Sequence, residues 1–162
     1  MNLIKSDTLA ELSQAAKENP RLRKNLNFHT RNDAHCHRLL NALEPGTYIP
    51  PHRHQDAEKD ETMIVLKGRF GVLIFDENGE VTEQFIMAES GNILGVTIPA
   101  GVFHSMVALD SGSVFFESKA GPYAALTEVE KASWAPSESD TASAAFLEKM
   151  MAFFIEHPCK NT

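Results

Sequence analysis

Cysteine and long apolar runs are scarce in this sequence. Its 162 residues include two cysteines, Cys36 and Cys159, which form neither a C-x-x-C site nor a disulfide framework. No apolar run approaches the roughly 20 residues that span a bilayer, and the N-terminal residues lack the apolar stretch of a signal peptide. We therefore expect a cytoplasmic protein with no membrane partner, in which Cys36 is a small core residue of a strand.

Basic residues are outnumbered by acidic residues. The sequence holds 15 lysines and arginines against 22 acidic residues, a formal charge of −7, which argues against binding to nucleic acid or to an anionic membrane. The hydrophobic share of 43% is ordinary for a globular protein. A chain of this length buries roughly 68–70% of its unfolded surface, so we expect one domain with its own core.

Short alternating stretches separated by turn residues occupy the middle of the chain. Asn78-Gly79 lies between the apolar runs 69–75 and 80–88, which is the strongest short-range signal for a hairpin. Further turn residues occur at 89–91, 99–101 and 110–112. About seven or eight short strands with turns at intervals of about 8–12 residues predict an all-β sandwich or barrel.

A helix is expected at each end of the chain. Thr8 and Glu11 have the spacing of a capping box, and the helical pattern that follows ends at Asn19-Pro20. A second helix is expected from about residue 139 to 155. The predicted organisation is a helix and basic segment over residues 1–33, a β-barrel over 34–120, and a connection and helix over 121–162.

Four residues have the chemistry and spacing of metal ligands. His52 and His54 are two apart on an extended segment, so their rings lie on the same face. Glu61 begins an apolar run typical of a strand, and His104 follows the turn at 99–101. Three imidazoles and a carboxylate suit a divalent transition metal with coordination positions left open, and iron, manganese, nickel, cobalt and zinc all fit.

These residues resemble the motifs of the cupin superfamily. The first motif, G-x5-H-x-H-x(3,4)-E-x6-G, and the second, P-x-G-x2-H, are matched in turn by Gly46, His52, His54, Glu61 and Gly68, and by Pro99, Gly101 and His104. The resemblance implies a cupin-type double-stranded β-helix, or jelly-roll barrel, that binds its metal inside the barrel.

The sequence departs from the cupin motifs at two places. Six residues separate His54 from Glu61 where the pattern has three or four, and Ala108 stands where an asparagine is common. Glu58 has the usual distance from His54, whereas Glu61 keeps the six-residue distance to Gly68. We expect Glu61 to be the acidic ligand and keep Glu58 as the alternative.

A closer resemblance extends along most of the chain. Blocks similar to the WbuC family of cupin-fold metalloproteins are RLRKNLNFH at 21–29, RLLNAL at 38–43, PHRH at 51–54, the segment 61–68, GPY at 121–123 and WAPSE at 134–138. That family is associated with gene clusters for surface polysaccharides. The resemblance implies a link to polysaccharide biosynthesis but no particular reaction.

Residues 20–38 carry a local charge of +4, which is either a solvated face or a binding surface for an anion. His35 and His37 form a second H-x-H there, but no glutamate and glycine follow at the motif spacing, so no second metal site is expected. The candidates for binding an anionic substrate are Arg23, Asn27, His29, Arg38, Arg53 and Tyr123.

We expect a small-molecule metalloenzyme that acts on an anionic metabolite or a sugar derivative, as a metal-dependent isomerase, hydrolase or lyase, or dioxygenase. His29 and Tyr123 are the candidates for a general acid or base. The alternatives are a non-catalytic cupin that binds or senses a metabolite and a structural protein with a degenerate site. The apolar C-terminal helix and exposed sheet edges are compatible with a homodimer.

Overall fold

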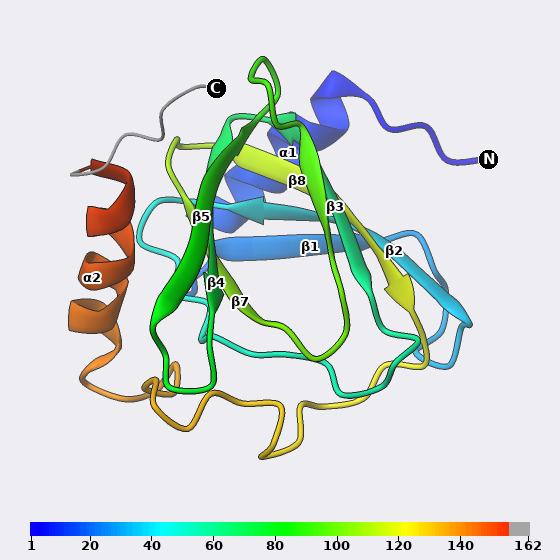
Figure 1. Ribbon diagram of the computed structural model, residues 1–162. Helices are drawn as coiled ribbons and strands as arrows, with labels where there is room; N and C mark the ends of the chain where they lie inside the picture. Colours follow the sequence, from blue (N-terminus) through cyan, green and yellow to red (C-terminus); the bar gives the residue numbers. More distant parts are fainter. Residues whose placement is uncertain (156–162) are drawn as a thin grey trace.

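The protein folds into two antiparallel sheets that face each other, as the computed structural model shows for residues 1–155 (Figure 1). One sheet has five strands in the order β1-β2-β8-β3-β6, and the other has three in the order β5-β4-β7. This two-sheet arrangement confirms the predicted jelly-roll class. The strands are β1 (Arg23–Asn27), β2 (Cys36–Leu43), β3 (Glu61–Lys67), β4 (Arg69–Phe75), β5 (Val81–Ala88), β6 (Gly95–Ile98), β7 (Phe103–Ala108) and β8 (Ser113–Ala120).

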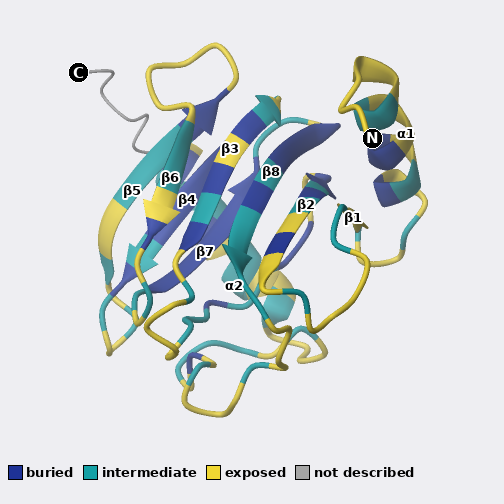
Figure 2. Ribbon diagram, turned by 90° about the vertical axis from the view of Figure 1, so that its right-hand side faces the viewer, coloured by how far each residue is buried: buried dark blue, intermediate teal, exposed yellow. Residues whose placement is uncertain are grey.

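The main core lies between the two sheets (Figure 2). Alternate residues of each strand point inward, and Phe70 packs edge-to-face on Phe115 of the opposite sheet with ring centroids 5.2 Å apart. The predicted hairpin is present, since Gly79 turns between β4 and β5 with a φ of 87°. At the end of the barrel away from this core, several inward-facing side chains are polar or charged, and they line the cavity described below.

Two helices cover the outside of the sheets. Helix α1 (Ser6–Lys17) buries Leu12 and Ala16 against Leu40 and Val114 of the five-stranded sheet. Helix α2 (Ser143–Ile155) packs beside the three-stranded sheet, where Phe154 is buried. Neither helix has the length and apolarity needed to cross a membrane.

The helix starts differ from the sequence prediction. The capping box at Thr8 and Glu11 is wrong, because α1 already begins at Ser6 and Lys5 before it makes no side-chain cap. Helix α2 begins at Ser143 rather than near 139, because a turn precedes it in which Asp140 accepts the backbone N–H of Ala142. Residues with capping chemistry lie inside α1 or in the turn before α2, so they do not mark the start of either helix.

The strand boundaries also correct the sequence analysis. The basic segment assigned to residues 1–33 contains β1, which pairs with β2 from Arg23 opposite Leu43 to Asn27 opposite Leu39. The barrel therefore begins at Arg23 and not at residue 34. The prediction that Cys36 is a core residue is wrong, because His37 is the buried neighbour and Cys36 is exposed. Cys159 lies outside the described residues.

Replacement of Gly71 by alanine tests how closely α2 packs on β4. A Cβ at this position would lie 2.5 Å from Cε2 of Phe154, so the ring has to move. We expect Gly71→Ala to lower the free energy of unfolding by about 1–3 kcal/mol, as overpacking does, measured by urea denaturation.

A double-mutant cycle supplies the control for this prediction. Phe154→Ala alone should cost about 3–5 kcal/mol, and adding Gly71→Ala to it should cost nothing more, because the clash has been removed. Gly91→Ala, in an exposed turn where the new Cβ would lie 3.1 Å from Cβ of Ala88, is the milder comparison. An equal cost of Gly71→Ala in both backgrounds would show that α2 does not pack as described.

Candidate metal centre

A backbone pairing brings the first two candidate ligands together. His52 and His104 exchange two hydrogen bonds, from His52 N–H to the His104 carbonyl (3.1 Å) and from His104 N–H to the His52 carbonyl (2.9 Å). Residues paired in this way present their side chains on the same face. Their ring centroids lie 4.6 Å apart as a result.

Both imidazoles are held by their Nδ1 atoms. Nδ1 of His52 lies 3.0 Å from the carbonyl oxygen of Pro50, and Nδ1 of His104 lies 2.9 Å from that of Val102. A ring that donates its Nδ1–H to a carbonyl keeps an Nε2 lone pair for a metal. Burial, followed by the neighbouring His104, lowers the pKa of His52 to about 4, so this ring is neutral at pH 7, the form that binds metals.

Glu61 is the carboxylate at the centre of the cluster. It is the first residue of β3 and is 3% exposed. One carboxylate oxygen lies 2.8 Å from Nε2 of His54, and the other lies 3.2 Å from Nε2 of His104. Burial by itself would raise the pKa of Glu61, but the hydrogen bonds to His104 and His54 and the charge of Lys119 hold that pKa below its ordinary value.

The donor set fits a divalent transition metal. One ligand atom from each of His52, His54 and Glu61 lies within 4.8 Å of the other two, and His104 adds a third imidazole that contacts the second oxygen of the carboxylate. Three nitrogens and one oxygen, buried together, are a borderline-soft set that first-row divalent metals prefer. The four residues with ligand chemistry in the sequence are therefore brought together.

Of the two glutamates left open by the sequence, only Glu61 reaches this cluster. Glu58 is exposed in the loop before β3, and its backbone N–H binds the side chain of Asp56. The longer loop extends outward into solvent and leaves the first residue of β3 in place.

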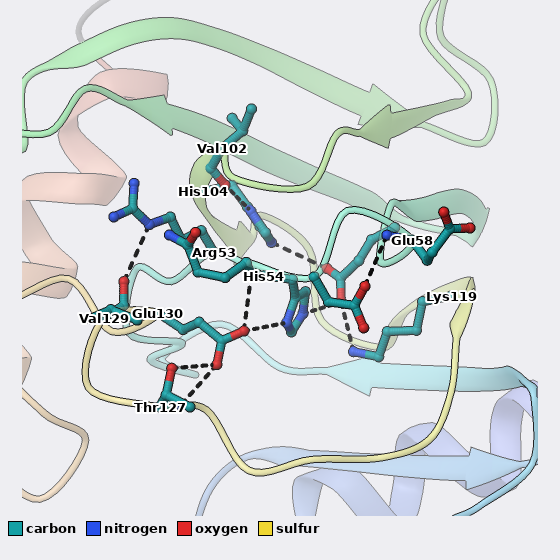
Figure 3. A network of polar contacts seen from close by, with 12 residues as sticks. Arg53, His54, Glu58, Val102, His104, Lys119, Thr127, Val129 and Glu130 are labelled. Atoms are coloured by element: carbon teal, nitrogen blue, oxygen red, sulfur yellow. Dashed lines mark hydrogen bonds and ion pairs between the residues drawn. The ribbon is translucent and has the colours of Figure 1, made fainter.

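Sequence reasoning missed Lys119, which lies directly opposite Glu61. Lys119 of β8 is paired with Glu61 on β3 and with His37 on β2, so the three side chains form one row across the sheet. Its Nζ lies 2.6 Å from Glu61, the contact drawn from Lys119 in Figure 3. The same Nζ lies 2.9 Å from Glu117, two residues back on the same face of the strand. Burial opposes its charge, but Glu117 and Glu61 together raise the pKa of Lys119 above the ordinary lysine value.

Glu130 was also missed, and it lies behind His54. Its carboxylate accepts the backbone N–H groups of Thr127 (2.8 Å) and Gln55 (3.0 Å), and it lies 4.0 Å from Nδ1 of His54 (Figure 3). The Thr127 and Gln55 hydrogen bonds lower the pKa of Glu130 to about 2. Glu130 thus ties the irregular segment 124–133 to the extended segment that carries His52 and His54.

Two cavities meet at this cluster. The inner cavity, of about 210 Å³, lies inside the barrel, and the outer cavity, of about 240 Å³, opens beside Tyr123. His52 and Lys119 line both. The polar and charged residues of the inner cavity are Arg23, Lys24, Asn25, Asn41, Glu61, Ser105, Glu117 and Lys119, together with His52 and His104.

Two of the candidates for anion binding line these cavities. Arg23 lines the inner one and donates to the Tyr48 carbonyl (2.7 Å) and to Glu138 (2.8 Å). Tyr123 lines the outer one and is 63% exposed. Arg53 does not line them, because its guanidinium lies over the Phe103 ring, 4.1 Å from the centroid.

The remaining candidates lie away from both cavities. His29 is half-buried and stacks on His37 with centroids 4.0 Å apart, while its Nδ1 accepts the backbone N–H of Arg38. The Arg38 side chain is exposed on β2, and Asn27 is exposed at the end of β1, where it accepts a hydrogen bond from Asn25. Of these, only His29 approaches the outer cavity, through its contact with His37.

Several solved structures are similar to this chain. TT1209 from Thermus thermophilus is 20% identical, with a TM-score of 0.52 over 74% of this chain and 97% of that one. KdgF from Halomonas sp. is 18% identical, with a TM-score of 0.49 over 63% and 82%. Oxalate decarboxylase from Bacillus subtilis is 20% identical, with a TM-score of 0.47 over 67% and 26%. Of these three, TT1209 has a TM-score above 0.5, and this chain shares its fold.

No curated protein is similar enough in sequence to count as a relative. Residues 4–87, just over half of the 162-residue chain, match the family described as "Domain of unknown function (DUF6016)". This stretch includes β1 to β4 and most of β5, and with them His52, His54 and Glu61. The chain therefore belongs to the DUF6016 family.

Proposed function

We propose that this protein is a metal-dependent enzyme that acts on a small anionic metabolite or sugar derivative. The ligands are His52, His54, Glu61 and His104. The observation that carries the proposal is the convergence of three ring nitrogens and one buried carboxylate beside a cavity that also contains cationic side chains. A divalent ion held there would polarise a carbonyl or lower the pKa of a bound water.

Catalysis is favoured over simple metabolite binding by the groups beside the ligands. An enzyme of the isomerase, hydrolase or lyase type needs a side chain that can hold or transfer a proton near the substrate. Lys119 is paired with Glu61 across the sheet, and Glu117 lies two residues before it on β8; both line the inner cavity. Tyr123 lines the outer cavity. A cavity lined only by apolar residues would instead have favoured the non-catalytic alternative, a cupin that senses or carries a metabolite.

The proposal also includes a relationship to WbuC-like cupins, and with it a function in the biosynthesis of surface polysaccharides. Two of the similar sequence blocks meet in space, since Arg21 and Arg23 both bind Glu138, at 2.6 Å and 2.8 Å. They form one wall of a hollow of about 560 Å³ that reaches His52. Contact between these blocks beside the ligands supports a shared role in shaping the site.

Removal of single histidines tests the ligand set. We expect His52→Ala and His104→Ala each to lower the affinity for Zn²⁺ or Mn²⁺ by about 100-fold or more, beyond the roughly 10–100-fold effect of changes outside the ligand shell. Competition with a chromophoric chelator measures the affinity, and elemental analysis of the purified protein measures metal content.

Circular dichroism should show that both variants keep the β-sheet fold, and His29→Ala is the matched control because His29 lies outside the cluster. Equal metal content in the wild type, His52→Ala and His104→Ala would refute the proposed site.

A pair of glutamine variants tests which glutamate binds the metal. Glu61→Gln should weaken metal affinity by about tenfold or more, because an amide oxygen is a neutral and poorer donor to a divalent ion than a carboxylate. Glu58→Gln should leave the affinity unchanged, since Glu58 is an exposed loop residue. The same chelator competition compares the two variants, and a larger loss in Glu58→Gln would assign the ligand to the loop.

A further inference from the structure

The charges at the centre of the inner cavity do not balance. Lys119 carries one positive charge and lies between the carboxylates of Glu61 and Glu117, at 2.6 Å and 2.9 Å. These three groups sum to −1. The two carboxylates that contact Lys119 therefore disfavour an anion at this point unless a cation is added.

Other charged side chains nearby do not restore the balance. Arg23 is engaged by Glu138 at 2.8 Å on the wall of the neighbouring hollow, where Arg21 shares the same carboxylate, and Lys24 is exposed, so solvent screens its charge. Glu130 lines neither cavity and accepts backbone N–H groups behind His54. The excess negative charge thus stays with the carboxylates that contact Lys119.

A divalent ion on the neighbouring ligands reverses this sign. The histidines bind a metal as neutral imidazoles, so two positive charges change the local sum from −1 to +1. The attraction acts at short range in a site shielded from water, where charge interactions are stronger than at the surface. Metal loading should thus convert the cavity from a site that repels anions to one that binds them.

Lys119 has a donor to offer to such an anion. An ammonium group has three N–H donors. Nζ of Lys119 donates one hydrogen bond to Glu61 and forms an ion pair with Glu117. The side chain lines both cavities, so its remaining donor can meet a ligand that lies beside the metal ligands. Glu117 is itself held by the Asn41 amide at 2.7 Å, which keeps the lysine positioned.

The size and lining of the inner cavity limit the ligand. A volume of about 210 Å³ corresponds to about seven water-sized groups, which suits one acyclic or single-ring acid. Asn25, Asn41 and Ser105 add polar atoms to the lining, whereas Met63 and Phe115 supply apolar walls. This mixture matches a molecule with hydroxyl groups on a carbon chain.

We propose that Lys119 and the metal together bind the carboxylate of a small hydroxylated acid, such as a sugar acid, and that the metal must bind before the acid. This inference rests on the metal site of the proposed function and adds a substrate class and an order of binding. Glu61 and Glu117 hold Lys119 in place, and their excess negative charge makes the metal a requirement for anion binding.

The test is calorimetric titration of the full chain with D-glucuronate and L-glycerate, using D-glucose as the neutral comparison. The Mn²⁺-loaded wild type should bind at least one of the two acids, and glucose should bind at least about tenfold more weakly. Treatment with a chelator should abolish the binding. Lys119→Met should weaken acid binding by about tenfold or more, because a charge-assisted hydrogen bond is lost. Lys67→Met, an exposed lysine of the same sheet, is the control and should bind like the wild type.

A second variant changes affinity in the opposite direction. Glu117→Gln keeps an oxygen for the Asn41 hydrogen bond but raises the local sum from −1 to 0, so the chelator-treated variant should show weak acid binding where chelator-treated wild type shows none. Structural damage would not produce this gain.

The outcomes separate this inference from the proposed function. Absence of binding of both Zn²⁺ and Mn²⁺ would overturn the proposed function and this inference together. Normal Mn²⁺ binding would overturn the inference alone if neither acid bound, if acids bound equally well after chelation, if Lys119→Met had no effect, or if Glu117→Gln gave no gain.

Discussion

The site depends on the pair of backbone hydrogen bonds that His52 and His104 make with each other. His104 lies at the start of β7 in the three-stranded sheet, whereas His52 belongs to the segment that leads through the loop into β3 of the five-stranded sheet. Their pairing therefore joins the two sheets at one end of the barrel. Glu61 is already at that end as the first residue of β3, so a single ladder contact brings ligands from both sheets to one point.

The candidate ligands of the first motif could be predicted from sequence because local geometry positions them. His52 and His54 share a face by the alternation of an extended chain. Glu61 keeps its distance from Gly68, which has a φ of 76° in the turn between β3 and β4. Loop length did not matter, since the extra residues around Glu58 extend outward. Turn and strand chemistry thus specify this part of the site without knowledge of the sheet order.

Lys119, Glu117 and Glu130 could not be found in this way. Lys119 meets Glu61 because β8 inserts between β2 and β3, a pairing of residues 58 apart in sequence that no local pattern encodes. Glu130 lies in an irregular segment whose path is set by backbone contacts with Pro51 and Arg53. Register explains the Cys36 error as well, because a shift by one residue exchanges the buried and exposed faces of a strand. Non-local pairing, rather than composition, decides which polar residues join the ligands.

The buried charges are hard to explain by stability. Desolvation of a carboxylate or an ammonium costs several kcal/mol per ion, and apolar replacements of buried ion pairs are often more stable. The barrel nevertheless places Glu61 and Glu117 within hydrogen-bonding distance of Lys119 at its polar end, while the opposite end is filled by Val65, Phe70 and Met87. The same strands could have continued the apolar pattern, since their alternation already points these positions inward. A charged row at that level lowers the stability of the fold, so its presence supports the proposed binding of a cation and an anion there better than it supports a packing role.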